Sequence, residues 1–172
     1  DLVRQNVKLG YYDKNIFEKY TTRDINKINE FIEHDRDLLF AHSGIKQLID
    51  KYLIQNRETK EIFETPQFAY MLVAMTLFAN ESNDRLEWIK KAYDNFSFFK
   101  INLATPVIAG ARTPLRSFAS CALFDVGDSM KSIGTHDYLF KKASASRYGL
   151  GFNISRMRPV NAKIRHGDVL HT

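Results

Sequence analysis

The sequence has only one cysteine, Cys121, in 172 residues. A single thiol excludes a disulfide within the chain and agrees with a reducing compartment. Metal-ligand spacing is also missing, because the five histidines match no pattern of zinc ligands. We therefore expect no metal site in this chain. The histidines stand at positions 34, 42, 136, 166 and 171.

Long hydrophobic runs, internal repeats and low-complexity segments are absent as well. No apolar stretch approaches the roughly 20 residues that a membrane-spanning helix needs, and the longest candidate, residues 68–79, is interrupted by Tyr70 and Thr76. The chain begins at Asp1, with neither a methionine nor a charged and then apolar leader. We therefore expect it to be an internal piece of a longer chain.

The composition indicates a globular protein with a basic region. At 44% hydrophobic and 26% charged residues, the chain can build a core and is not disordered throughout. Its net charge of +5 permits anionic partners, from nucleotides to nucleic acid. The basic excess is concentrated after residue 146, which favours a local phosphate site. It consists of Arg147, Arg156, Arg158, Lys163 and Arg165, against Asp168 alone.

Helical patterns dominate the first hundred residues. Apolar residues recur at helical spacing in several segments, and Thr65 followed by Pro66 is a typical helix start. These signals predict helices over residues 22–32, 43–49, 66–78 and 85–98.

Two segments of this half predict other structures. Residues 52–54 and 61–64 are short strand-like runs around a polar segment, which predicts a small hairpin. Residues 101–109 are apolar but broken by Pro106, which predicts an extended or looped segment.

The last third predicts a strand, a helix and a second strand. Residues 118–126 form a continuous apolar run, typical of a strand buried on both faces. Residues 127–129 are expected to cap a helix that runs to about residue 146, and residues 148–154 form the second strand. Such a βαβ unit has parallel strands, so Asp128 and Arg158, which follow the two strands, should lie at one edge.

Short motifs follow one another along the chain in a fixed order. They closely resemble the large, catalytic subunit of class I ribonucleotide reductase, particularly its bacterial and bacteriophage branch, and the resemblance covers essentially the whole chain. The motifs are EHDRD (33–37), KYL (51–53), TPQF (65–68), LATPVIAGARTP (103–114), SFASC (117–121), GDS (127–129), RYGLGFN (147–153) and RMR (156–158).

The resemblance implies an α/β fold in two parts. Residues 1–113 would form a mostly helical N-terminal region with the small hairpin. Residues 114–172 would begin a ten-stranded α/β barrel with its first βαβ unit, leaving the barrel incomplete. The helix at 129–146 matches the family's homodimer helix.

The resemblance also implies a reaction, the reduction of ribonucleotides to deoxyribonucleotides. Cys121 matches one of two thiols that reduce the substrate after a thiyl radical has removed the ribose 3′ hydrogen. The second thiol and the radical cysteine would lie beyond Thr172, so we expect the chain alone to be inactive. Thr105, Ser120 and Gly151 match substrate-binding positions, together with Cys121. Without the resemblance, these are ordinary core, strand and loop residues.

An allosteric site is implied by the same comparison. Asp128 matches the residue that contacts the ribose of a bound deoxynucleoside triphosphate or ATP, with Ser129 and Ile133 nearby. Arg158 and Arg165 match the basic loop that receives the effector phosphates. Read alone, these residues are a helix cap and a solvated loop. Pro159–Asn161, His166 and Ala119 depart from the family pattern and leave effector preference open.

The family implies no covalently bound cofactor, since the radical comes from the metal cofactor of a separate small subunit. The expected partners are the remainder of the large subunit, a second large subunit, the small subunit, and thioredoxin or glutaredoxin. No membrane is involved, and the expected location is the cytoplasm, or the host cytoplasm for a phage protein.

Two other functions are compatible with the composition. A basic helical module that binds nucleic acid would need exposed aromatics among its basic residues, whereas the aromatics here stand at core spacing. The chain could also be the assembly half of a split enzyme, which gains activity only with its complement.

Overall fold

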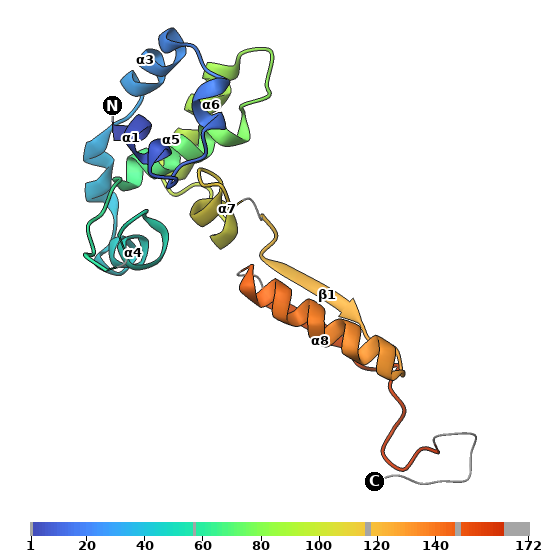
Figure 1. Ribbon diagram of the computed structural model, residues 1–172. Coiled ribbons are helices and arrows are strands. Elements are labelled where there is room, and N and C mark those ends of the chain that lie inside the picture. The colour runs from blue at the N-terminus through green and yellow to red at the C-terminus, as the bar shows by residue number, and fades with distance from the viewer. Residues whose placement is uncertain (1, 57, 116–117, 147–148, 164–172) are drawn as a thin grey trace. The chain divides into compact units, whose positions relative to one another are not determined.

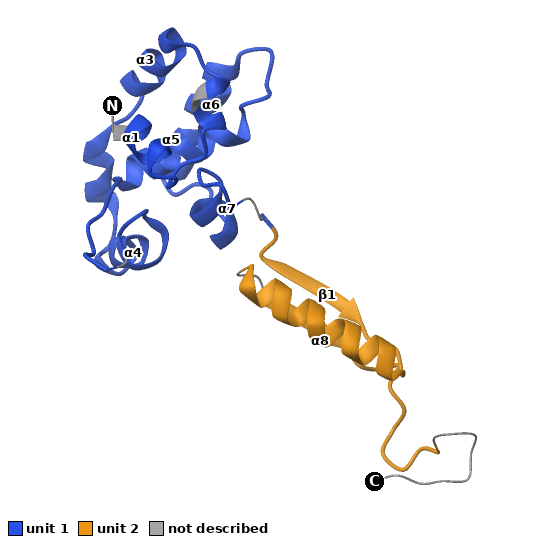
Figure 2. Cartoon of the chain, viewed as in Figure 1, with its two compact units in different colours: residues 1–118 blue, residues 119–172 orange. Residues whose placement is uncertain are grey.

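The computed structural model describes residues 2–56, 58–115, 118–146 and 149–163 (Figure 1). The chain divides into two compact units, unit 1 (Asp1–Phe118) and unit 2 (Ala119–Thr172), shown in blue and orange in Figure 2. This division falls a few residues after position 113, where the sequence analysis placed the end of the helical region.

Unit 1 is helical, and the four helices expected from the sequence are present within a few residues of their predicted ends. The helices are α1 (Leu2–Lys8), α2 (Asn15–Glu18), α3 (Thr22–Glu30), the 3-10 helix η1 (His34–Leu39), α4 (His42–Gln47), the π-helical turn η2 (Leu48–Tyr52), α5 (Pro66–Leu77), α6 (Arg85–Ser97) and α7 (Thr105–Gly110). None of the described helices is long and apolar enough to cross a bilayer.

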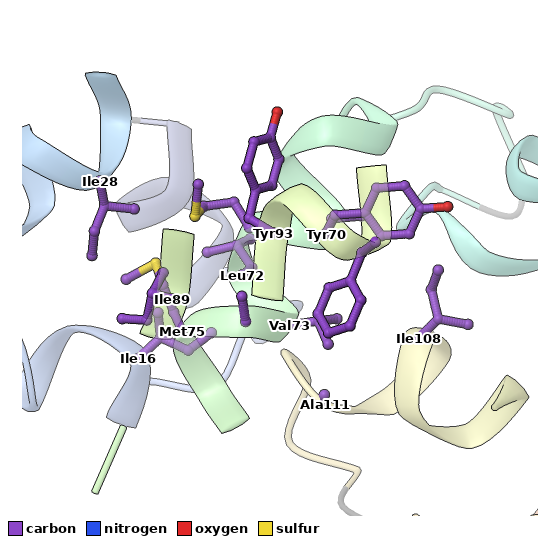
Figure 3. Close-up of a cluster of buried hydrophobic side chains, with 14 of the residues drawn as sticks. Ile16, Ile28, Tyr70, Leu72, Val73, Met75, Ile89, Tyr93, Ile108 and Ala111 are labelled. Atoms are coloured by element: carbon purple, nitrogen blue, oxygen red, sulfur yellow. The ribbon is translucent and has the colours of Figure 1, made fainter. Parts of the chain in front are cut away.

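Helix α5 forms the centre of the core of unit 1. The Thr65 hydroxyl accepts a hydrogen bond from the backbone N–H of Phe68, and Pro66 occupies the first turn, where a missing N–H costs nothing. The helix is apolar on all sides, so it is buried among its neighbours. Figure 3 shows Val73 of α5 in the same buried cluster as Ile89 of α6 and Ile28 of α3.

The small hairpin expected in unit 1 is present in a short form. One antiparallel bridge pairs Gln55 with Ile62, and the backbone N–H of Phe63 donates to the carbonyl of Ile54 beside it. One prediction for unit 1 was wrong. The expected loop at 101–109 contains helix α7, in which Pro106 lies in the first turn, where proline favours a helix.

A buried ion pair connects the segments of unit 1. Arg112 and the Glu64 side chain are 0% exposed, and the Arg112 Nε–Glu64 Oε2 distance is 2.8 Å. The Tyr12 hydroxyl donates to Glu64 Oε2 at 2.7 Å, and the backbone N–H of Ile54 donates to Oε1 at 2.7 Å. Burial, followed by the charge of Glu64, raises the pKa of Tyr12, which therefore stays a proton donor.

Unit 2 is the predicted βαβ unit. Strand β1 (Cys121–Asp125) leads through helix α8 (Met130–Ala145) to strand β2 (Gly149–Asn153), and the strands pair in parallel from Cys121–Gly149 to Asp125–Asn153. The Ser129 side chain caps α8 by accepting from the backbone N–H of Ser132.

The expectation that β1 is buried on both faces was wrong for this chain. Helix α8 covers one face, where His136 lies edge-on to Phe124 and Phe152, with centroid distances of 5.6 and 6.2 Å. The opposite face is uncovered by any residue that the structure describes, and Leu123 is 87% exposed there. An apolar strand sequence indicates burial in the complete protein, which one helix alone cannot supply.

Glu64→Gln should lower the free energy of unfolding of unit 1 by about 3–5 kcal/mol, because the Arg112 charge would remain buried without its partner. Urea unfolding of the chain, followed by the fluorescence of its single tryptophan, Trp88, measures this change. Lys90→Gln, which breaks the exposed pair with Asp94 on α6 of the same unit, is the control and should cost less than about 1 kcal/mol. A loss of similar size in both variants would contradict the prediction, and Glu64→Gln combined with Arg112→Met should recover much of the stability.

Candidate functional site

Cys121 and Gly151 lie on the same, uncovered face of the two-stranded sheet. Side chains alternate along a strand, and Phe124 faces α8, so Cys121 and Leu123 point to the opposite face. Gly151 is the register partner of Leu123 and therefore shares that face. The thiol of Cys121 is free and exposed. Its predicted role as a redox thiol stays a prediction.

Ser120 directly precedes β1 and is exposed. Its carbonyl accepts the N–H of Gly149 at 2.9 Å, which continues the pairing of the two strands by one residue. Ser120, Cys121 and Gly151 are thus brought together by the start of the parallel sheet. A hollow of about 350 Å³ farther along the strands is lined by Leu123–Asp125 and Gly151–Asn153.

Thr105 belongs to unit 1, where it is the first residue of α7 and is exposed. Its Oγ1 lies 3.2 Å from the hydroxyl oxygen of Tyr52, at the end of η2. Sequence reasoning missed Tyr52 as a neighbour of Thr105, because the two residues are 53 positions apart and meet only through tertiary packing.

Asp128 and Arg158 meet at the edge of the sheet where both strands end. Arg158 Nε donates to Asp128 Oδ2 at 2.6 Å, and Arg158 Nη1 donates to the carbonyl of Lys163 at 3.2 Å. The prediction that these two side chains lie at one edge is confirmed. Ser129 begins the adjacent helix, and Ile133, one turn farther along, is 36% exposed.

A second ion pair at this edge was missed by sequence reasoning. Arg156 Nε lies 3.0 Å from Asp125 Oδ2, and the Asn153 amide donates to Asp125 Oδ1 at 3.1 Å. The sequence contains a signal for this second pair. Arg156 and Arg158 both follow β2, and Asp125 and Asp128 stand at and after the end of β1. Arg165 and Arg147 lie outside the described residues, so their predicted roles stay predictions.

No cluster of three or more potential metal ligands occurs within the described part of the chain. A hollow of about 510 Å³ in unit 1, between Asp24 and residues 81–87, contains none of the candidate residues. The chemistry-bearing groups found in the structure are therefore the exposed thiol, the hydroxyls of Ser120 and Thr105, and the paired charges at the strand ends.

Comparisons with known proteins show a similarity to ribonucleotide reductases. The family model for the ribonucleotide reductase all-alpha domain matches residues 38–116. Over its whole length, the chain is 44% identical to the ribonucleoside-diphosphate reductase 1 subunit alpha of Escherichia coli K12. It is 39% identical, again over its whole length, to the ribonucleoside-diphosphate reductase subunit alpha of Enterobacteria phage T4. Over its whole length, the chain is thus similar to the alpha subunits of ribonucleoside-diphosphate reductases.

The resemblance inferred from the ordered motifs is thus confirmed, because the relatives are named as reductase alpha subunits. It spans 23% of the length of the two relatives, so most of their sequence has no counterpart here. The all-alpha match falls within unit 1, in agreement with the helices found there. A module that binds nucleic acid would expose aromatic residues among its basic residues. In unit 1, aromatic residues such as Tyr70, Tyr93 and Phe96 are buried, which argues against this alternative function.

Gly151→Ala should change stability by less than about 1 kcal/mol. The new Cβ would meet Leu123 Cδ2 at 2.6 Å, but the exposed Leu123 side chain can move away. Gly110→Ala is the contrasting variant, because its Cβ would meet the backbone oxygen of Leu115 at 2.8 Å, and about 1–3 kcal/mol should be lost.

Thermal unfolding of the two variants of the 172-residue chain, in which Leu123 is exposed, makes the comparison. A larger decrease in Tm for Gly151→Ala than for Gly110→Ala would contradict the prediction.

Proposed function

We propose that the protein is the portion of a ribonucleoside-diphosphate reductase large subunit that contributes one redox thiol, part of the substrate site and the effector site. The observation that carries the proposal is the free Cys121 thiol, exposed on the same open face of the sheet as Gly151, in a chain that is similar to these large subunits.

The proposed role of Cys121 follows from the electron balance of the reaction. Replacement of the ribose 2′-hydroxyl by hydrogen needs two electrons and two protons, of which one proton leaves in water with the hydroxyl and the other goes to C2′. The 3′ hydrogen, which a thiyl radical removes first, is returned at the end and does not enter this balance. Two thiols supply both by forming a disulfide, which thioredoxin or glutaredoxin then reduces. This chain holds one thiol, so the second thiol and the radical cysteine would be on other parts of the protein, and the 172-residue chain alone would be inactive.

The two strands are proposed to begin a ten-stranded α/β barrel. A two-stranded sheet with one apolar face uncovered is marginal in water, and Leu123 is 87% exposed on that face. Further parallel strands would pair with the free edges, and the barrel interior would enclose the open face. The proposed substrate residues Ser120, Cys121 and Gly151 would then point into the barrel, with Thr105 supplied by unit 1.

The effector site is proposed at the carboxyl edge of the strands. Ligands of parallel α/β sheets collect at this edge, and Asp128 and Arg158 meet there. Arg158 and Arg165 would bind the triphosphate of a deoxynucleoside triphosphate or ATP, Asp128 would accept from the ribose hydroxyl, and Ser129 and Ile133 would lie alongside.

The same proposal sets the partners. These are the remainder of the large subunit, a second large subunit along α8, a small subunit whose metal cofactor supplies the radical, and thioredoxin or glutaredoxin. The exposed Ile133, Tyr138 and Phe140 on α8 support a protein contact at that helix. The proposed location is the cytoplasm, or the host cytoplasm for a phage protein.

Cys121→Ser in the complete reductase should abolish deoxyribonucleotide formation, because serine cannot form the disulfide that supplies two electrons. The side chain is exposed and the change is almost isosteric, so folding and effector binding should stay close to wild type. Turnover is measured with dithiothreitol and with thioredoxin, and a near-normal rate with either reductant would refute the proposed role of Cys121.

Arg158→Ala in the assembled reductase should weaken binding of a deoxynucleoside triphosphate about ten- to a hundredfold, through the loss of charge-assisted bonds to phosphate. Lys90→Ala is the matched control, because Lys90 is also an exposed cation in an ion pair but lies in unit 1 beside Asp94. Equilibrium binding and the choice among substrates are measured together. Unchanged affinity with a normal effector response would leave Arg158 as a loop charge paired with Asp128.

A further inference from the structure

Two hydroxyl groups from separate segments of unit 1 meet at the surface. The Tyr52 hydroxyl, at the end of η2, lies 3.2 Å from Thr105 Oγ1, at the start of α7. Thr105 is exposed, whereas Tyr52 is partly buried beside it. A ligand on the outer side could therefore reach Thr105 while Tyr52 remains behind it.

A third residue favours one direction of this hydrogen bond. The Gln47 amide nitrogen lies 3.4 Å from the Tyr52 hydroxyl oxygen and can only donate to it. Either hydroxyl can donate in the contact between Tyr52 and Thr105. The bond from Gln47 favours Tyr52 as the donor, because Tyr52 then both accepts and donates once. In that arrangement Thr105 accepts from Tyr52 and keeps its own proton for an outside acceptor.

The buried arginine holds the two segments that carry these hydroxyls. Arg112 Nη2 donates to the backbone carbonyl of Tyr52 at 2.8 Å, and Arg112 Nη1 donates to the carbonyl of Ile108 in α7. Glu64 fixes the guanidinium from the other side. One rigid planar group therefore sets the spacing between η2 and α7, and with it the distance between the two hydroxyls.

We propose that Tyr52 is a positioning residue that orients the Thr105 hydroxyl as a donor toward an anionic group of the substrate, such as a phosphate oxygen of a nucleoside diphosphate. The inference rests on the proposed function, in which Thr105 contacts substrate. It adds that Tyr52 acts on the substrate only through Thr105. Removal of the Tyr52 hydroxyl should therefore lower the affinity for substrate and leave the rate of the chemical step unchanged.

The test is a double-mutant cycle in the complete reductase, with KM and kcat for a ribonucleoside diphosphate measured at saturating effector. Tyr52→Phe removes only the hydroxyl and should raise KM about three- to tenfold, with kcat changed less than about twofold. Thr105→Val should raise KM at least as much. The double variant should match Thr105→Val alone, while Thr105→Ser should stay sensitive to Tyr52→Phe because it keeps the hydroxyl.

Tyr20→Phe is the matched control for a purely structural hydroxyl, because the Tyr20 hydroxyl donates to the buried carbonyl of Met75 at 2.6 Å. It should lower Tm and leave KM unchanged. Additive effects of Tyr52→Phe and Thr105→Val, or an unchanged KM in Tyr52→Phe, would overturn the inference and leave the role of Thr105 standing. An unchanged KM in Thr105→Val would overturn the proposed role of Thr105 and the inference with it.

Discussion

The buried ion pair of Arg112 and Glu64 is the interaction on which the arrangement of unit 1 depends. Removing two charges from water costs several kcal/mol per ion, so such a pair persists only where further hydrogen bonds complete it. Here the Tyr12 hydroxyl and the Ile54 N–H serve Glu64, while two backbone carbonyls accept from Arg112. These directional bonds define where α7 lies against η2, which apolar packing alone would leave less specific.

Unit 2 depends on a different constraint, because it cannot bury its own apolar surface. Its two strands have one helix to cover them, and that helix protects only the face that carries Phe124 and Phe152. The other face exposes Leu123 together with Cys121. Since the chain spans 23% of its relatives, the surface that carries the thiol is also the surface that the rest of a large subunit would cover. The proposed chemistry and the missing packing therefore concern the same face.

Local signals predicted the elements whose caps and periodicity act within one segment. Helices α5 and α8 have hydroxyl caps at Thr65 and Ser129, and both begin where the sequence places them. The errors arose where tertiary contacts or a single proline changed the outcome. Pro106 was taken as a break although it lies in the first turn of α7. The predicted hairpin is present but short, because the Ile54 N–H donates to the Glu64 carboxylate instead of continuing the pairing with Phe63.

The candidate site shows the same limit. The βαβ rule brought Asp128 and Arg158 to one edge, since parallel strands end together whatever their side chains. No comparable rule relates Tyr52 to Thr105, whose approach depends on the buried arginine between their segments. Thr105 could be predicted as a substrate-binding residue from the ordered motifs and the family resemblance. Tyr52 became a candidate positioning residue only from its contact with Thr105 in the structure.

Arg158 and Arg112 each form an ion pair, but they differ in how far their side chains are exposed to solvent. Arg158 and Asp128 are 40% and 33% exposed, so their attraction is screened, and such pairs contribute about 0.2–1 kcal/mol. In the proposed effector site, a triphosphate would offer Arg158 several charged oxygens and would replace Asp128, which could then accept from a ribose hydroxyl. Arg112 has no such freedom, because it is wholly enclosed with Glu64 and a ligand cannot reach it. The buried arginine is therefore a fixed support for α7, whereas the exposed Arg158 is the one proposed to exchange its partner for a ligand.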